Sequence, residues 1–263
     1  MIKKILLFSF LLITIFFTGH FILNNRKPYE QPVLQEEPVI YEEEEEEINK
    51  KEITEYVENI TVIDNQPMYY AYPKDTNSAK LIIYSHGQLQ RITTNLDDPY
   101  MLTMRDYGKF FALHGFVFTA SNQHDDNWGE KEALNDIKKS IEYIESLEEI
   151  EILPKKLLVG FSMGGRSAIN YALENSNEVE KIALLAPSPS PLISEKSVKN
   201  LINIPTKIWH GEDDINIPIA ISQDYIKSFK TYDKEIEFSS VKETDHFELE
   251  TSMFEEILEF FKD

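Results

Sequence analysis

The 263-residue chain contains no cysteine and carries a formal net charge of -20 at pH 7. The lack of thiols excludes a cysteine nucleophile and a thiolate metal site, so covalent chemistry must use oxygen or nitrogen. Half of the negative charge lies in residues 29–58, which hold twelve Glu against two Lys. An acidic chain without a basic stripe repels phosphate backbones, which excludes a nucleic-acid partner.

Residues 1–27 are predicted to be a targeting segment. Lys3 and Lys4 precede a run of nineteen mostly apolar residues, Ile5 to Leu23, which as a helix nearly crosses a hydrocarbon layer of about 30 Å. No A-x-A cleavage signature follows, which favours an uncleaved signal anchor over the alternative, a cleaved signal peptide. The two lysines favour a cytoplasmic N-terminus, so we expect the remainder to be extracytoplasmic, either membrane-anchored or secreted.

Residues 28–52 are predicted to be a disordered acidic linker. Three prolines and the unbroken run Glu42 to Glu47 dominate this segment. Such a composition buries too little apolar surface to offset its ordering entropy, and like charges extend the chain. We expect the linker to hold a catalytic domain, residues 53–263, away from a membrane.

Apolar runs and helical periodicities alternate from residue 53 onward, which predicts an α/β domain with a mostly parallel sheet and helices on both faces. The expected strands are residues 60–63, 68–72, 81–84, 116–120, 157–159, 182–185, 206–209 and 236–241, the first two forming a hairpin. The expected helices are residues 99–113, 130–149, a segment after Ser162, and 247–261. Only about twenty residues join the 182–185 and 206–209 strands, which is too short for a large lid domain.

The segment Gly160-Phe161-Ser162-Met163-Gly164-Gly165 is the most informative motif. It matches G-x-S-x-G between a buried strand and an apolar helix, where small flanking residues permit a sharp turn that exposes a serine hydroxyl. Ser162 is therefore the predicted nucleophile. The alternative is a glycine-rich turn in which the serine is incidental.

A serine hydroxyl needs a base to accept its proton, and His246 is the predicted base. It lies between the last expected strand and the last expected helix, and it gives the chain order Ser, Asp, His. By contrast, His114 precedes Gly115 at a helix end, where capping carbonyls is the expected role. His210 is expected to be a structural turn residue.

The carboxylate that orients the base is expected in the loop after residues 206–209, which offers Glu212, Asp213 and Asp214. Spacing alone does not separate these neighbouring acids. The oxyanion is expected to bind two backbone N–H groups. Met163, which follows the nucleophile, supplies one, and Gln88 in the loop after residues 81–84 supplies the other.

Three further side chains are expected to line the substrate cleft: Leu89, Trp128 and Phe161. Trp128 belongs to a segment that follows a strand end, where the cleft of an α/β sheet lies. The same segment contains His124, Asp125 and Asp126, but such neighbours do not form the closed geometry of a transition-metal site. We therefore predict no metal and no cofactor.

The chain from about Ile60 to its C-terminus resembles the α/β-hydrolase superfamily, within it the branch of dienelactone hydrolases, platelet-activating-factor acetylhydrolases and related bacterial esterases. Tyr84 to Gly87, Phe111 to Phe118 and Gly160 to Gly165 carry the resemblance in order. The superfamily's acid loop, H-G-x-x-D-x-x-x-P, matches His210 to Pro218 and implies Asp214 as the acid, with Asp213 as the alternative. The chain departs from dienelactone hydrolases in having serine in place of cysteine, and many relatives have glycine or an aromatic residue at the position of Gln88.

The resemblance implies a serine hydrolase that cleaves carboxylic esters through an acyl-enzyme intermediate. An open cleft suits small-molecule and polymeric esters alike. Two alternatives remain at this stage: a peptidase or amidase that uses the same triad, and a non-catalytic, membrane-anchored binding protein that retains the fold. The sequence does not indicate an oligomeric state.

Overall fold

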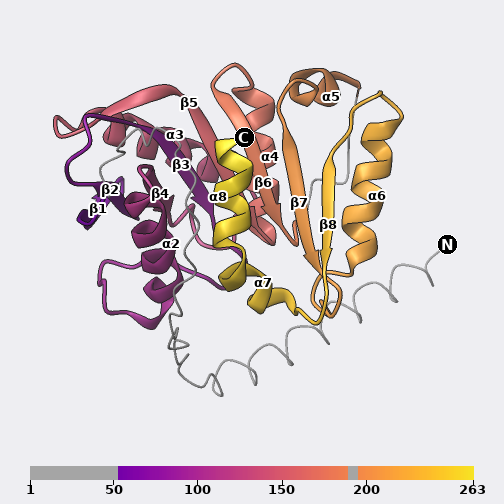
Figure 1. Ribbon diagram of the computed structural model, residues 1–263, viewed down its shortest axis with the longest axis horizontal. Coiled ribbons are helices and arrows are strands. Elements are labelled where there is room, and N and C mark those ends of the chain that lie inside the picture. Colours follow the sequence, from indigo (N-terminus) through magenta and orange to yellow (C-terminus); the bar gives the residue numbers. More distant parts are fainter. Residues whose placement is uncertain (1–52, 189–194) are drawn as a thin grey trace, which may run out of the picture. The chain divides into compact units, whose positions relative to one another are not determined.

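Eight strands form one sheet in the computed structural model, which describes residues 53–188 and 195–263 (Figure 1). The strands are β1 Tyr56–Ile63, β2 Gln66–Pro73, β3 Ser78–Ser85, β4 Val117–Ser121, β5 Glu151–Phe161, β6 Val179–Leu185, β7 Thr206–Gly211 and β8 Glu237–Val241. Their order is β1-β2-β4-β3-β5-β6-β7-β8. β2 runs antiparallel to β1 and to β4, and all other neighbouring strands are parallel, which confirms the predicted hairpin and the mostly parallel sheet.

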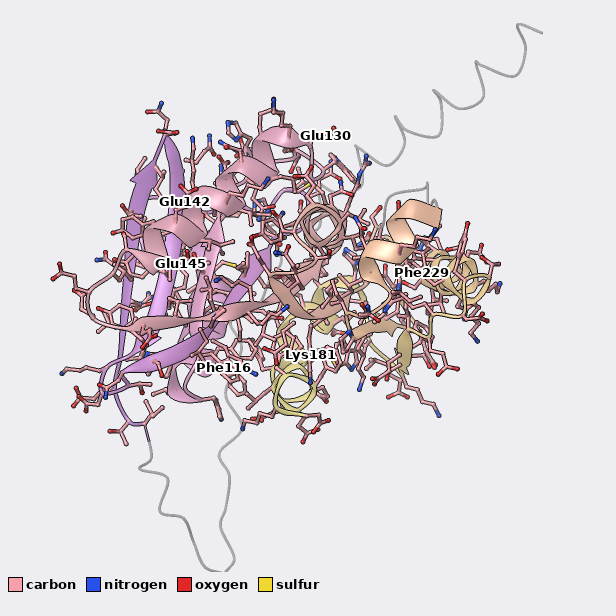
Figure 2. All side chains as sticks on the ribbon, turned by 90° about the horizontal axis from the view of Figure 1, so that it is seen from above. Phe116, Glu130, Glu142, Glu145, Lys181 and Phe229 are labelled. Carbon is pink, nitrogen blue, oxygen red and sulfur yellow. The ribbon has the colours of Figure 1, made fainter. Side chains whose placement is uncertain are left out.

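Helices cover both faces of this sheet. They are the 3-10 helix η1 Pro99–Met101 and the α-helices α2 Leu102–Leu113, α3 Lys131–Glu145, α4 Met163–Glu174, α5 Glu195–Leu201, α6 Ile219–Lys230, α7 His246–Ser252 and α8 Phe254–Lys262. Buried side chains of α3, α4, α5 and α6 form one core, and those of α2, α7 and α8 form the other. Figure 2 shows Glu130 just before α3 and Glu142 and Glu145 on it, on the opposite side of the sheet from the yellow α8.

The central strands are apolar on both faces because each face meets helices. In β3, Leu81 and Ile83 belong to the core under α3 and α4, while Ile82 and Tyr84 belong to the core under α2, α7 and α8. All four side chains are at most 3% exposed. Alternation with a period of two thus assigns neighbouring residues to different cores.

The carboxyl ends of the parallel strands meet at one edge of the sheet, and this edge positions the candidate site. The loops after β3, β4, β5, β7 and β8 all begin there. Within the described ranges these connections are short, and no large lid domain covers the edge.

Two predicted helices differ from the structure, and two observed helices were not predicted. The helix expected at 130–149 ends at Glu145, and the helices α5 and α6 were not expected. The single helix expected at 247–261 consists of α7 and α8, which meet at Met253 with φ -101° and ψ 19°. Neither Gly nor Pro marks this break. Leu249 of α7 and Ile257 of α8 are both 0% exposed.

The predictions for residues 1–27 and 28–52 lie outside the described residues. In the part of the chain that the structure does describe, no helix has both the length and the apolar character needed to cross a membrane.

A substitution of Leu184, at the centre of the sheet, tests whether both faces of the sheet are covered by a hydrophobic core. It is 0% exposed, so Leu184→Ala is expected to lower the free energy of unfolding by about 2–5 kcal/mol through lost transfer energy and a cavity. Urea denaturation followed by circular dichroism measures the change. Val62→Ala is the control, because Val62 is 52% exposed and should change stability by less than about 0.5 kcal/mol. Equal effects of the two variants would contradict the assignment of the core.

Candidate active site

Ser162 occupies the sharp turn between β5 and α4. Its backbone has φ 51° and ψ -120°, a region that a non-glycine residue enters at a cost of about 1–3 kcal/mol. Three backbone hydrogen bonds hold the turn: the Ser162 N–H donates to Leu185 O at 2.9 Å, and Ser162 O accepts from the Ser188 N–H at 2.9 Å and from the Gly165 N–H at 3.0 Å. The predicted serine therefore lies in a strained strand-to-helix turn that its neighbours maintain.

Gly164 allows the start of α4 to approach the end of β3. A Cβ atom at this position would lie 2.0 Å from Ser85 O and 2.7 Å from His86 O, so any side chain would force the two segments apart. The close approach places the helix start beside the loop that begins at His86. The first N–H groups of a helix have no acceptor within it, and Met163 contributes its N–H at this positive end of the dipole.

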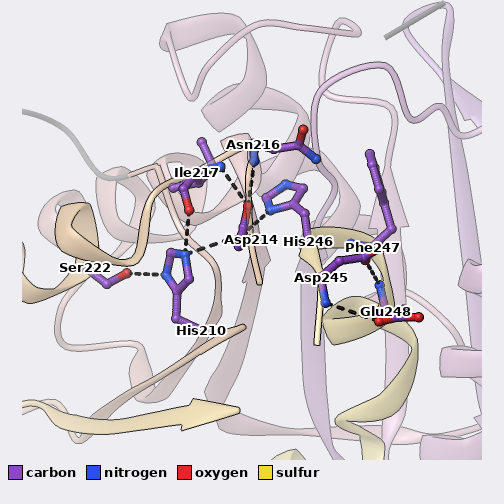
Figure 3. A network of polar contacts seen from close by, with 9 residues as sticks. All are labelled: His210, Asp214, Asn216, Ile217, Ser222, Asp245, His246, Phe247 and Glu248. Atoms are coloured by element: carbon purple, nitrogen blue, oxygen red, sulfur yellow. Dashed lines mark hydrogen bonds and ion pairs between the residues drawn. The ribbon is translucent and has the colours of Figure 1, made fainter. Parts of the chain in front are cut away.

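His246 and Asp214 form a direct hydrogen bond (Figure 3). The distance from Nδ1 of His246 to Oδ2 of Asp214 is 2.6 Å, and the two side chains are 5% and 0% exposed. An ionised carboxylate only accepts hydrogen bonds, so Nδ1 is the donor in this contact, and the neutral form of this imidazole has its lone pair on Nε2. The structure thus brings Asp214, rather than the exposed Asp213, to the imidazole.

The second oxygen of Asp214 accepts two backbone hydrogen bonds. Its Oδ1 lies 2.9 Å from the Asn216 N and 2.8 Å from the Ile217 N. His210 lies on the other side, with Nε2 2.8 Å from Ile217 O and 3.3 Å from Asp214 Oδ2, and with Nδ1 2.8 Å from the Ser222 hydroxyl. Because Ile217 O only accepts, Nε2 of His210 is a donor. The network in Figure 3 fixes the carboxylate from three directions.

This network determines the charge of Asp214. Burial by itself would raise the pKa of the carboxyl, but hydrogen bonds from His210, His246 and the Ile217 N–H outweigh it and hold the pKa of Asp214 below its ordinary range. The carboxylate is therefore ionised at neutral pH, the state that stabilises an imidazolium.

The start of α7 fixes the position of His246. Asp245 caps the helix, since its Oδ1 accepts from the N–H groups of Phe247 and Glu248, both at 2.8 Å. Glu248 Oε2 accepts from the Asp245 N–H at 3.2 Å and completes a capping box. His246 is the first residue of this capped helix, so the cap orients its side chain toward Asp214.

A close backbone contact joins the loops that contain Asp214 and His246. The Asp213 N–H donates to Thr244 O at 3.2 Å. A Cβ atom on Gly211 would lie 2.2 Å from the same oxygen, so only glycine fits where β7 ends. Gly211 therefore allows the two loops to come into backbone contact.

Phe161 lies between His246, the predicted base, and the turn at Ser162. Its ring centroid lies 4.8 Å from that of His246, and Ser162 is the next residue. Within the described residues, neither the Ser162 hydroxyl nor Nε2 of His246 has a hydrogen-bond partner, and Ser162 is 8% exposed. Both groups are available, and such contacts often tighten only when substrate binds.

The other predicted site residues take different positions. Leu89 is half exposed with φ 65°, and its N–H donates to Asp126 Oδ1 at 2.8 Å. Trp128 is partly buried, whereas Phe161 is only 1% exposed. Gln88, the predicted oxyanion donor, is exposed at the same edge. Contact of these residues with substrate stays a prediction.

His124 pairs with Asp136 rather than with its sequence neighbours. Its Nδ1 lies 2.7 Å from Asp136 Oδ2. Across the described ranges, no group of three or more His, Asp or Glu side chains is arranged to hold a metal ion.

Comparison with known proteins identifies the family. Residues 98–263, more than half of the chain, match the model of the family described as Phospholipase/Carboxylesterase. The chain belongs to this family. A comparison with curated proteins finds no match.

Solved structures share the fold of this family member at low sequence identity. A protein assigned as a dienelactone hydrolase from Klebsiella pneumoniae is 17% identical, with coverage of 73% of this chain and 88% of that chain and a TM-score of 0.58. S-formylglutathione hydrolase from Staphylococcus aureus is 15% identical, with coverage of 78% of this chain and 95% of that chain and a TM-score of 0.59. The acylaminoacyl peptidase of Pyrococcus horikoshii is 17% identical, with coverage of 81% of this chain and 42% of that chain and a TM-score of 0.60. Family and fold together make the protein a hydrolase of the esterase or peptidase type.

Sequence reasoning missed several polar residues around the site. Ser222, on the unpredicted α6, contacts His210. Gln90 and Glu250 join the loop after β3 to α7. The spacing of four residues from His246 to Glu250 is a signal for a shared helix face, although it does not reveal the distant partner.

Asp214→Asn tests the electrostatic role of the carboxylate. At pH 7 it should lower the free energy of unfolding by about 1–3 kcal/mol, because an amide loses a charge-assisted hydrogen bond to His246. Since the folded-state pKa of Asp214 lies below its ordinary value of 3.8, the wild-type advantage is complete above that value and is lost as the pH falls toward the folded-state pKa. Denaturant titrations from pH 7 to pH 3 measure the difference.

The matched control is Asp213→Asn at the exposed neighbour, which should change stability by less than about 0.5 kcal/mol throughout. A difference between wild type and Asp214→Asn that widens on acidification would contradict the direction of the shift.

Proposed function

We propose that the protein hydrolyses carboxylic esters through an acyl-enzyme intermediate, with Ser162 as nucleophile, His246 as general base and Asp214 as the orienting acid. The observation that carries the proposal is the 2.6 Å hydrogen bond from His246 Nδ1 to Asp214, together with the φ of 51° at Ser162, whose neighbour Phe161 has its ring centroid 4.8 Å from that of His246. Family membership supports hydrolysis, and the geometry supports the assignment of roles to these residues.

In the proposed acylation step, the Ser162 oxygen attacks the ester carbonyl carbon while Nε2 of His246 accepts the hydroxyl proton. The carbonyl oxygen gains negative charge and accepts hydrogen bonds from the N–H groups of Met163 and Gln88, each worth about 3 kcal/mol of barrier. Collapse of the tetrahedral intermediate breaks the bond to the alcohol, which receives the proton from His246. Asp214 remains ionised and stabilises the transient imidazolium.

Deacylation repeats the sequence with water as nucleophile. His246 accepts a proton from water, the oxyanion forms again at the same two N–H groups, and the acid leaves as Ser162 recovers its proton. No redox step and no external group are needed. The strained backbone at Ser162 keeps the oxygen clear of its own helix for both attacks.

A peptidase or amidase activity on the same residues is the second candidate. The acylaminoacyl peptidase of Pyrococcus horikoshii shares the fold with a TM-score of 0.60, and the chemistry of the two activities differs only in the leaving group.

The site lies at a sheet edge that no described lid covers, which favours access by small-molecule and polymeric esters.

We also propose that residues 1–27 hold the enzyme at the extracytoplasmic face of a membrane or direct its secretion. The support is the sequence itself, with Lys3 and Lys4 before an apolar run and an acidic linker after it. The ester substrate is then a molecule met outside the cytoplasm.

Ser162→Ala tests the proposed nucleophile. It should reduce kcat on short-chain p-nitrophenyl esters by roughly 10⁴-fold or more, because the acyl-enzyme cannot form. A fluorophosphonate probe should label wild type and not the variant, since only an activated serine reacts. Parallel assays on p-nitroanilide peptides separate esterase from peptidase activity.

Ser140→Ala is the matched control. This buried serine on α3 donates to Asp136 O at 2.8 Å and lies outside the proposed machinery, so labelling and turnover should stay at wild-type levels. Wild-type turnover in Ser162→Ala would eliminate the mechanism. Absence of probe labelling in wild type would favour a non-catalytic binding protein.

A further inference from the structure

A buried carboxylate on α7 binds the loop that follows β3. Glu250 is 2% exposed, and its Oε1 accepts from the Tyr84 hydroxyl at 2.5 Å. Nε2 of Gln90 lies 2.8 Å from Oε1 and 2.7 Å from Oε2 of the same carboxylate. The Tyr107 hydroxyl donates to the backbone O of Glu250 at 2.6 Å. Burying a carboxylate is costly unless such donors surround it.

Gln90 transmits this attachment to the backbone of the loop. Its Oε1 accepts from the Gly87 N–H at 2.7 Å, while its Nε2 faces Glu250. The Gly87 N–H is a donor and the Glu250 carboxylate offers only acceptors. The Gln90 amide can therefore form hydrogen bonds to both in only one orientation, with Oε1 toward Gly87 and Nε2 toward Glu250. The side chain of Gln90 therefore links α7 to the peptide unit between His86 and Gly87, which is one unit before the one that carries the Gln88 N–H.

The other side of the same loop is attached to the segment after β4. Nε2 of His86 lies 2.9 Å from Asn122 O, and the Leu89 N–H donates to Asp126 Oδ1 at 2.8 Å. Hydrogen bonds thus hold the N–H groups of Gly87 and Leu89, the residues on each side of Gln88. The N–H of Gln88 itself lies between two fixed neighbours.

One helical turn separates the two functions of α7. His246 begins the helix and Glu250 lies four residues later, a spacing that places both on one face. The helix therefore carries the proposed base and, through Glu250 and Gln90, an attachment to the proposed oxyanion loop. Burial and the adjacent Glu250 charge raise the pKa of Tyr84 well above its ordinary value, so this hydroxyl stays protonated and donates.

We propose that Glu250 and Gln90 are positioning residues, which orient the Gln88 N–H toward the oxyanion and couple its position to that of His246. The proposal rests on the proposed function. Neither side chain touches the reacting atoms. Their contribution is expected in transition-state stabilisation rather than in substrate affinity, because the oxyanion charge develops only in the transition state.

The test exchanges the two side chains. In Gln90→Glu, two carboxylates face each other in a buried site and repel, so the bridge opens. In the double variant Gln90→Glu/Glu250→Gln, the new amide at position 250 donates to the new carboxylate at position 90. That carboxylate still accepts from the Gly87 N–H, and the Tyr84 hydroxyl still has an oxygen acceptor. The hydrogen bonds of the Tyr84 hydroxyl and of the Gly87 N–H keep an oxygen acceptor, and one of the two contacts between positions 90 and 250 is restored with donor and acceptor reversed.

Four quantities are measured for each variant: kcat, KM, the inhibition constant of a trifluoromethyl ketone, and the melting temperature. The ketone forms a hemiketal oxyanion on the serine and so reports on the oxyanion site. Gln90→Glu should lower kcat by roughly tenfold to a hundredfold and raise the ketone inhibition constant in parallel. KM should stay within about threefold, and the double variant should recover kcat to within about threefold of wild type.

Tyr171→Phe is the matched control for a merely structural effect. It removes a tyrosine-to-glutamate hydrogen bond, from the Tyr171 hydroxyl to Glu178 at 3.3 Å, from residues that play no part in the proposed machinery. It should affect the melting temperature and leave kcat and ketone inhibition unchanged.

A Gln90→Glu variant with wild-type kcat, or a double variant no better than the single one, would overturn the proposal. If Gln90→Glu does not fold, the same measurements on Gln90→Met test the proposal, because this substitution removes the hydrogen bonds to Gly87 and Glu250 without adding charge.

The wild-type assay separates failure of the proposed function from failure of the positioning role. A wild-type protein that neither hydrolyses esters nor reacts with a fluorophosphonate refutes the proposed function, whereas an active wild type with insensitive variants refutes only the positioning role.

Discussion

The hydrogen bond between His246 and Asp214 requires two loops that are 32 residues apart in the chain to meet at one place. The parallel alignment of β7 and β8 brings their carboxyl ends to the same edge, and Gly211 lets the backbones touch there. The Asp214 carboxylate can be buried and ionised because His210 and two backbone N–H groups surround it. Without these donors, burial would favour the protonated acid and the imidazole would lose its partner.

The same edge contains a second constraint, which concerns backbone rather than side chains. Ser162 adopts a left-handed conformation, and Gly164 removes the side chain that would otherwise strike Ser85. The start of α4 can then lie against the loop after β3, where Gln88 and Gln90 follow. Strain at Ser162 is maintained because the surrounding strands determine where β5 ends and α4 begins.

The hydrogen bonds of Gln90 and Glu250 suggest why the last helix is divided. A continuous helix from residue 247 to 261 would satisfy the amphipathic pattern, yet α7 stops at Ser252 and α8 begins at Phe254. The short α7 keeps His246 at the site and Glu250 beside Tyr84 and Gln90. The following α8 packs Ile257 and Phe261 on the sheet in a different direction.

The sequence by itself determined the order of the strands along the chain, the sharp strand-to-helix turn at Ser162 and the location of His246 after the last strand. These features depend on local patterns: apolar runs, small residues around a serine, and a histidine between a strand and a helix. Without the family resemblance, local patterns did not distinguish Asp213 from Asp214 as the partner of the imidazole. They also did not predict the helix α6, the break at Met253 or the partners of Glu250. Tertiary structure decided these points, because each depends on side chains that are distant in sequence and become neighbours only when the sheet closes.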